Sequence, residues 1–401
     1  SGTSIANATG GDASLTNKTT AGIVLDSNSS ITSASGKLNT VLWSDTDNDA
    51  DGYISIASGS SITTNGGNIT LGGGTDPASD YAVGNAAQRA GVNLLGGLNA
   101  GGGDISVRGE GLSTGGAGID GGAGTGNIQT SGSGTIAMTG IGYDLGAADG
   151  ATGYGIWFSN RTISTAGGAI SLTGTSHNAA GAGNCWGIDL NTATVSSANG
   201  DIAITGDSDN AAFYGTSTFL STIGTTGTGS VTQTSNTGKT WVGTLQTTGS
   251  GDVTISAAST IERDAGAPAI QVGGDLTMTA NGAINDPGRI TVAGTTQITA
   301  GAGNDITLSN TSNDFGGAVS VVSGADVAIT DSNAMILGAV SATGVVNIAT
   351  LTGDLTLAGA VSTTNATEDA ITLIAGKSTE MVLPMPVGAS RKSRPPRENK
   401  R

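Results

Sequence analysis

The sequence predicts an all-β protein wound as a parallel β-helix, in which one short strand motif repeats along most of the chain. Three observations support this fold class. The composition suits a thin repeated core, an apolar triplet recurs at nearly fixed spacing, and no stretch keeps the apolar spacing of an amphipathic helix for three turns. A repeat array of this kind stacks its units along one axis, so its core grows in one dimension.

The composition excludes a single large globular core. The 401 residues include 69 glycines, whereas aromatic residues make up only 3% and charged residues 11% of the chain. Hydrophobic residues still reach 36%, which is not the composition of a disordered chain. A stacked array fits both facts, because each coil buries only a few medium-sized apolar side chains.

The repeated unit is a small or acidic residue followed by an apolar–x–apolar triplet. Alternation at period two, rich in β-branched residues, is typical of short strands, and the glycines that usually precede each triplet suit tight corners. The clearest copies lie at 68–71, 104–107, 169–172, 201–204, 252–255, 275–278, 305–308, 326–329 and 354–357.

The spacing of the triplets divides the array into two parts. Residues 1–225 are predicted to form longer, loop-bearing coils, with triplets roughly 31 to 34 residues apart and a second element, Gly then Val or Ile, before them. Residues 226–376 are predicted to form shorter coils of about 22 residues, enough for three strands and their corners. We expect the triplets to pair as parallel strands over roughly 60–376.

An antiparallel β-sandwich is the main rival fold, because it also contains many short strands. It gives no reason for one motif to recur at a fixed lag. In a parallel β-helix, equivalent residues stack about every 4.8 Å, so every coil needs similar side chains inside. The recurrence therefore favours the β-helix.

Residues 377–401 break the repeat pattern and are predicted to form a basic, proline-rich, disordered tail. Prolines are poorly tolerated in strands, and seven Lys or Arg fall in this stretch with two Glu. A cloning remnant or a shifted reading frame would explain it, and a genuine basic interaction tail is the alternative. The tail contributes +5 to the formal net charge of −16, so the rest of the chain carries −21.

The charge and cysteine content bear on partners and compartment. An acidic body is expected to repel nucleic acid and anionic membranes, and it could attract divalent cations.

Cys185 is the only cysteine, so no internal disulfide can form. No apolar run is long enough to span a bilayer as a helix. The chain begins without Met or a signal sequence, which indicates a mature product or an interior fragment.

One acidic turn matches the start of a calcium loop. Asp47, Asp49 and Asp51 alternate in the pattern D-x-D-x-D-G, and three such carboxylates can converge on one Ca²⁺. The match is incomplete, because position twelve of the loop is Ser58 and not a bidentate Glu. These three Asp residues are the metal-ligand candidates, and an acidic solvated turn is the alternative; no other cofactor is predicted.

The chain has few residues suited to catalysis, and its aromatic residues are the better candidates for ligand contact. His177 is the only histidine and is expected in a surface loop, while Cys185 is expected to be a packed thiol. The expected ligand contacts are Trp157, Phe158, Trp186 and Tyr214, which fall in the long coils. Aromatic residues that simply fill wide coils are the alternative interpretation.

Several blocks of the sequence resemble the repeat region of filamentous-haemagglutinin-type exoproteins, which use two-partner secretion. The blocks that carry the resemblance are 42–45, 52–56, 62–74, 304–310, 313–319, 331–334 and 337–340. The resemblance covers most of 1–376, and no copy of the family's N-terminal secretion domain is visible in it. It implies a single-stranded, right-handed parallel β-helix, export through an outer-membrane secretion pore, and roles in adhesion or biofilms.

The expected function is therefore that of a secreted or surface-exposed bacterial adhesin, a monomeric rod without catalytic activity. Loops of the long coils are expected to bind glycan or matrix on a host or neighbouring cell, and neither nucleic acid nor a membrane span is expected. Two alternatives stay open. One is a carbohydrate-active β-helix enzyme, a lyase or hydrolase, and the other is a calcium-dependent extracellular matrix or ice-associated repeat protein.

Overall fold

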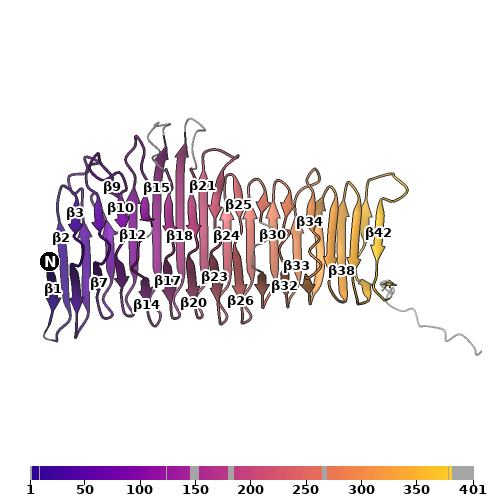
Figure 1. The fold of residues 1–401 in the computed structure, drawn as a ribbon, viewed down its shortest axis with the longest axis horizontal. Helices are drawn as coiled ribbons and strands as arrows, with labels where there is room; N and C mark the ends of the chain where they lie inside the picture. The colour runs from indigo at the N-terminus through magenta and orange to yellow at the C-terminus, as the bar shows by residue number, and fades with distance from the viewer. Residues whose placement is uncertain are drawn as a thin grey trace, which may run out of the picture.

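The computed structural model is an elongated stack of β-coils with the N-terminus at one end (Figure 1). It describes residues 2–8, 10–122, 124–144, 153–178, 185–263, 269–377 and 379–381. All inter-strand ladders between these residues are parallel, and no helix occurs among them. No helix in this part of the chain is long and apolar enough to cross a membrane. The predicted all-β parallel β-helix is confirmed.

The strands form three parallel sheets, and successive strands of the chain pass from sheet A to sheet B to sheet C. Sheet A has 12 strands: β1 (Ser4–Asn7), β4 (Ser30–Ser33), β7 (Ser61–Thr63), β11 (Gly97–Asn99), β14 (Ile128–Thr130), β17 (Thr162–Thr165), β20 (Thr194–Ser197), β23 (Thr222–Thr225), β26 (Thr244–Thr247), β29 (Ile270–Val272), β32 (Ile290–Val292) and β35 (Asp314–Phe315).

Sheet B contains the longest strands: β2 (Ala13–Lys18), β5 (Leu38–Trp43), β8 (Ile69–Gly72), β9 (Ala82–Val83), β12 (Ile105–Glu110), β15 (Ile136–Asp144), β18 (Ile170–Asn178), β21 (Ile202–Ser208), β24 (Val231–Ser235), β27 (Val253–Ala257), β30 (Leu276–Ala280), β33 (Thr296–Thr299), β36 (Ala318–Gly324), β38 (Met335–Ala342), β40 (Leu355–Leu357), β41 (Val361–Thr363) and β43 (Thr379–Met381).

Sheet C has 14 strands: β3 (Ile23–Leu25), β6 (Ile54–Ile56), β10 (Val92–Leu94), β13 (Ile119–Gly122), β16 (Ile156–Ser159), β19 (Ile188–Asn191), β22 (Tyr214–Ser217), β25 (Lys239–Trp241), β28 (Ile261–Glu262), β31 (Ile284–Asn285), β34 (Ile306–Leu308), β37 (Val327–Asp331), β39 (Val346–Thr350) and β42 (Ile371–Ile374). Beyond β35, the described strands belong to sheets B and C alone.

The repeated triplets fill the space between the sheets. In sheet B, Ile105 pairs with Ile136, Ile136 with Ile170, and Ile170 with Ile202, and all four side chains are buried. Period two sends these residues inward and their neighbours outward, so one continuous apolar core runs along the rod.

The triplets do not all belong to one sheet, which the sequence did not indicate. The copies that begin at Ile306 and Val327 lie in sheet C, where Ile306 pairs with Ile284 and Val327. The reason is that every sheet turns one face to the core, so the same apolar–x–apolar pattern suits strands of any sheet.

Parallel pairing extends beyond the roughly 60–376 over which the triplets were expected to pair. Parallel pairing begins at β1 and β4, and it continues to β43, which pairs with β40. The predicted tail, 377–401, includes β43 near its start. Its basic part, 382–401, lies outside the described residues.

Candidate functional site

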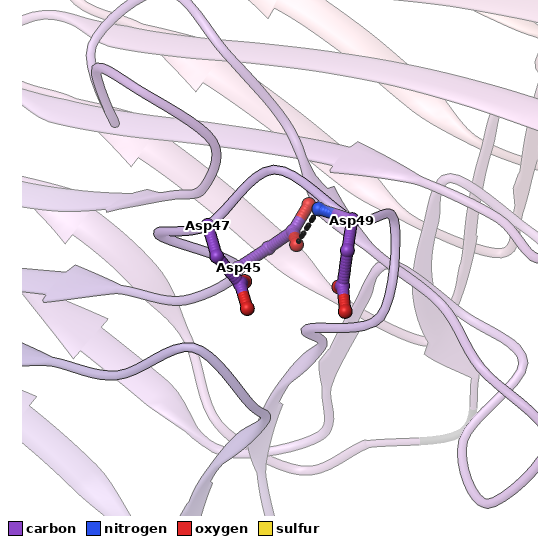
Figure 2. Close-up of side chains that lie close together, drawn as sticks. All are labelled: Asp45, Asp47 and Asp49. Atoms are coloured by element: carbon purple, nitrogen blue, oxygen red, sulfur yellow. Dashed lines mark hydrogen bonds between the residues drawn. The ribbon is translucent and has the colours of Figure 1, made fainter.

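The predicted calcium turn brings three carboxylates together, but not the three that the spacing suggested. Carboxylate oxygens of Asp45, Asp47 and Asp49 lie within 4.8 Å of one another (Figure 2). Asp51 points to a different partner and accepts a hydrogen bond from Asn85 Nδ2. The third carboxylate of the cluster is therefore that of Asp45 and not that of Asp51. The backbone of Asp45 adopts the left-handed conformation (φ 51°), and its side chain is buried in the turn.

Asp45 already has a structural role in this turn. Its Oδ1 accepts hydrogen bonds from the backbone N–H of Asp49, at 3.1 Å, and of Asp51, at 3.5 Å. Burial raises the pKa of Asp45, and the backbone hydrogen bonds oppose that shift. The geometry is that of an acidic turn closed by its own carboxylate.

The aromatic residues form the most distinctive surface of the molecule. Six of them form a continuous series of ring contacts across neighbouring coils, and we call this set, in order of contact, the aromatic ladder: Trp157, Tyr154, Trp186, Tyr214, Trp241 and Phe219. Successive ring centroids lie 5.4 to 5.9 Å apart, mostly edge to face. Pairs at this distance and angle are favourable contacts, so the rings hold one another in place.

The strand register of sheet C explains why the rings meet. Tyr154 and Trp186 stand directly before a glycine that leads into β16 and β19, and Tyr214, the first residue of β22, also stands directly before a glycine. They are therefore equivalent positions of three successive coils, stacked about 4.8 Å apart. A Tyr-Gly or Trp-Gly pair before each strand is the sequence signal that could have found Tyr154, which the sequence analysis missed.

A second column of outward residues crosses the same strands. Asp120 pairs with Trp157, Trp157 with Asp189, Asp189 with Ser217, and Ser217 with Trp241. Trp241 was also missed, because it lies in the short-coil part, where no contact surface was expected. The ladder therefore extends across residue 225, the predicted boundary between the longer and the shorter coils.

Most side chains of the ladder remain partly exposed, as a binding surface requires. Trp157, Trp186, Tyr214, Phe219 and Trp241 are half-buried. Tyr154 is buried, and burial raises the pKa of its hydroxyl.

Phe158 does not belong to this surface, and its prediction as a ligand contact is wrong. It lies next to Trp157 on β16, but period two turns it into the core, where it is fully buried. A side chain at Gly121 on the neighbouring strand would overlap the Phe158 ring. Phe158 therefore fills the space that this glycine leaves.

Asp189 is a buried acid on the outer side of sheet C. Its neighbours Ile188 and Leu190 face the core, so Asp189 faces the ladder, yet only 4% of it is exposed. Burial raises the pKa of Asp189 to about 7, although a hydrogen bond from Ser217 acts to lower it. Its Oδ1 has no hydrogen-bond partner among the described residues. An unsatisfied buried acceptor costs about 1–3 kcal/mol, so this oxygen needs an explanation.

One end of the ladder carries a charged pair. Lys239 Nζ lies 3.0 Å from Glu262 Oε1, and the Tyr214 hydroxyl donates to Glu262 Oε2 at 2.7 Å. Burial alone would raise the pKa of Glu262, but the hydrogen bonds from Tyr214, Lys239 and Thr260 hold it below its usual value. Lys239 is thus already neutralised by Glu262.

The lone histidine and cysteine have structural partners. His177 lies within β18 and not in a loop, so that expectation is wrong; its ring packs on Tyr143 at 5.1 Å and its Nδ1 lies 3.0 Å from Asp209 Oδ2. Cys185 is fully buried, as predicted, and its thiol donates to Asp144 Oδ2 at 2.9 Å. Burial raises the pKa of the Cys185 thiol to about 12, so it stays protonated and unreactive.

Shallow hollows lie on sheet A, away from the ladder. One hollow, of about 450 Å³, is lined by residues such as Thr247, Gln271 and Thr291. It contains no aromatic side chain and one carboxylate, that of Asp314. The ladder on sheet C is the better candidate for a functional site.

The fold and the ladder together define a repeat protein with a parallel β-helix architecture and an outward aromatic surface. A family model described as repeats of unknown function (DUF5649) matches residues 259–322, which span β28 to most of β36. No curated protein matches the chain at a significant level.

Proposed function

We propose that the chain is a non-catalytic, adhesin-like rod that binds surface glycan through the aromatic ladder. The observation that supports it is the unbroken series of ring contacts from Trp157 to Trp241, with most rings half-buried. Aromatic rings give large, rigid contact areas, and sugar rings pack their apolar faces on them. A stiff stack of coils beneath would hold this surface away from its anchoring point.

The proposal includes a setting that rests on the resemblance to filamentous-haemagglutinin-type proteins. The chain would be a monomeric rod, secreted or held on a bacterial surface, after export through an outer-membrane pore. Its acidic body, with a formal net charge of −16 for the whole chain, supports a partner that is not nucleic acid.

The test is a binding assay on the full chain with a glycan array, followed by titration of the best ligands. We expect Trp186→Ala to weaken binding about tenfold, since loss of one ring contact worth about 1.4 kcal/mol has that effect. Tyr53→Ala is the matched control, because Tyr53 is a half-buried aromatic outside the ladder. Equal losses in both variants would contradict the proposal.

A carbohydrate-active enzyme is the second candidate, and one observation favours it. Asp120 and Asp189 flank Trp157 in the register of sheet C, and burial raises the pKa of both carboxyl groups. Glycosidases use such pairs of carboxylates, one of them protonated. Release of reducing ends from a bound polysaccharide, lost in Asp120→Asn, would overturn the non-catalytic proposal.

A rise in melting temperature with calcium, lost in Asp47→Asn, would support the calcium-dependent alternative.

A further inference from the structure

The outer column of sheet C contains both carboxylates and aromatic rings. In register along neighbouring strands, it contains Asp120, Trp157, Asp189, Ser217, Trp241 and Glu262. Each step is one strand, or about 4.8 Å. A ligand that lies along the rod axis would therefore meet acidic groups and ring faces in turn.

The acidic groups at one end of this column have no cationic partner. Among the described residues, neither Asp120 nor Asp189 forms an ion pair, and Lys239 is engaged by Glu262. Asp120 is half-buried, and the Oδ1 of Asp189 accepts no hydrogen bond from the part of the chain that the structure describes. The site thus offers negative charge and an unused acceptor next to Trp157.

A matching ligand must combine positive charge with flat apolar faces. Sugar rings supply the faces, and a protonated amino group supplies the charge and hydrogen-bond donors that a carboxylate accepts. Ammonium groups are also attracted to the faces of Trp and Tyr. A neutral glycan would leave Asp120 and Asp189 unpaired, whereas an adjacent ammonium group would favour the ionised form of Asp189, whose pKa burial raises to about 7. A sulfated glycan would be repelled by the negative charge.

We propose that the aromatic ladder and its flanking carboxylates bind a glycan with free, protonated amino groups, such as a glucosamine polymer. This inference rests on the proposed glycan binding and names its ligand class. Asp120 and Asp189 pair with amino groups on either side of Trp157. The partly exposed rings of Trp157, Trp186, Tyr214 and Trp241 contact the sugar faces over four successive coils, which requires an extended chain and not a single small cation.

The experiment measures binding of the full chain to glucosamine oligomers and to N-acetylglucosamine oligomers of equal length, by calorimetry at pH 7. We expect the amino oligomer to bind at least tenfold more tightly. Asp120→Asn and Asp189→Asn should reduce this preference, whereas Asp369→Asn, an exposed change outside the ladder, should leave it intact. Circular dichroism melting checks that each variant folds, and Asp120 is the safer position because it is half-buried.

The outcomes separate this inference from the proposed function. Equal affinity for the two oligomers, with both weakened by Trp186→Ala, would overturn the amino-sugar assignment and leave glycan binding in place. Absence of ladder-dependent binding to any glycan would contradict both. A lysine-rich peptide that binds as tightly as the amino oligomer, and that depends equally on Asp120, would overturn the glycan assignment in favour of a protein partner.

Discussion

Ile306 and Thr307 show how a single step along a strand separates the core from the surface. Ile306 is fully buried between coils, whereas Thr307 is partly exposed on the outer face of β34. This inward and outward alternation could be predicted residue by residue from the sequence, because it depends only on the two-residue period of a strand.

Substitution of these two residues tests the alternation. Ile306→Asp places an unpaired charge in the core and should reduce the free energy of unfolding by several kcal/mol. Thr307→Asp should cost far less, because its side chain reaches water. Chemical denaturation of both variants measures the difference. Similar losses would show that the assigned faces are wrong.

Asp189 should make stability depend on pH. Its pKa in the folded chain is raised from 3.8 to about 7, so the folded state holds a proton that the unfolded state loses. Between about pH 4 and pH 7, stability should therefore fall as pH rises, by at most about 4 kcal/mol, because one pKa unit corresponds to about 1.4 kcal/mol.

Asp189→Asn isolates this effect from those of other titrating groups. The amide cannot ionise, so the difference in unfolding free energy between the variant and the wild type should grow in favour of the variant from pH 4 to pH 7. Urea denaturation at a series of pH values measures it. A constant difference across this range would show that Asp189 titrates normally.

At the scale of elements, neighbouring coils are joined by polar contacts as well as by strand ladders. Arg263, just after β28, forms a buried ion pair with Asp286, just after β31, and Arg263 Nη1 lies 2.9 Å from each carboxylate oxygen. Burial raises the pKa of Asp286 despite this partner. Sequence reasoning could not find the pair, because both residues lie at corners without a periodic pattern.

Removal of one partner of this pair should destabilise the short coils. Arg263→Met leaves the Asp286 carboxylate buried without its cation and should cost about 3–5 kcal/mol. The double variant Arg263→Met, Asp286→Leu should recover most of that loss, because no charge is left uncompensated. Thermal melting of the single and double variants tests this, and an equally unstable double variant would contradict it.

The aromatic ladder shows where element-level prediction works and where it fails. Trp157 and Trp186 were expected on the surface because they lie beside the repeated Gly-apolar element, and Tyr214 was expected there because it falls in a long coil. The prediction of Phe158 as a ligand contact failed, because the burial of its ring depends on the space that Gly121 leaves on the neighbouring strand. Trp241 was missed because coil length, and not strand register, was taken as the guide to the binding surface.

At the scale of the molecule, repetition made the fold predictable. A motif that recurs at fixed lag requires stacked parallel coils, and the pairing from β1 to β43 follows that rule. The assignment of triplets to sheets B and C could not be predicted, because the inward faces of the sheets have similar chemistry. The acidic turn was found from its spacing, yet its closing carboxylate, Asp45, depends on a left-handed backbone that spacing does not reveal.

The pairing of each coil mainly with the coils beside it has a mechanical consequence. The hydrogen bonds between coils lie along the rod axis, so a pull on the two ends would open them one after another and not all at once. Each coil that detaches would release a short length of slack chain, and the next coil would become the new end. A rod that holds a cell to a surface would then lengthen in small steps, limit the tension on its contacts, and rewind when the load falls.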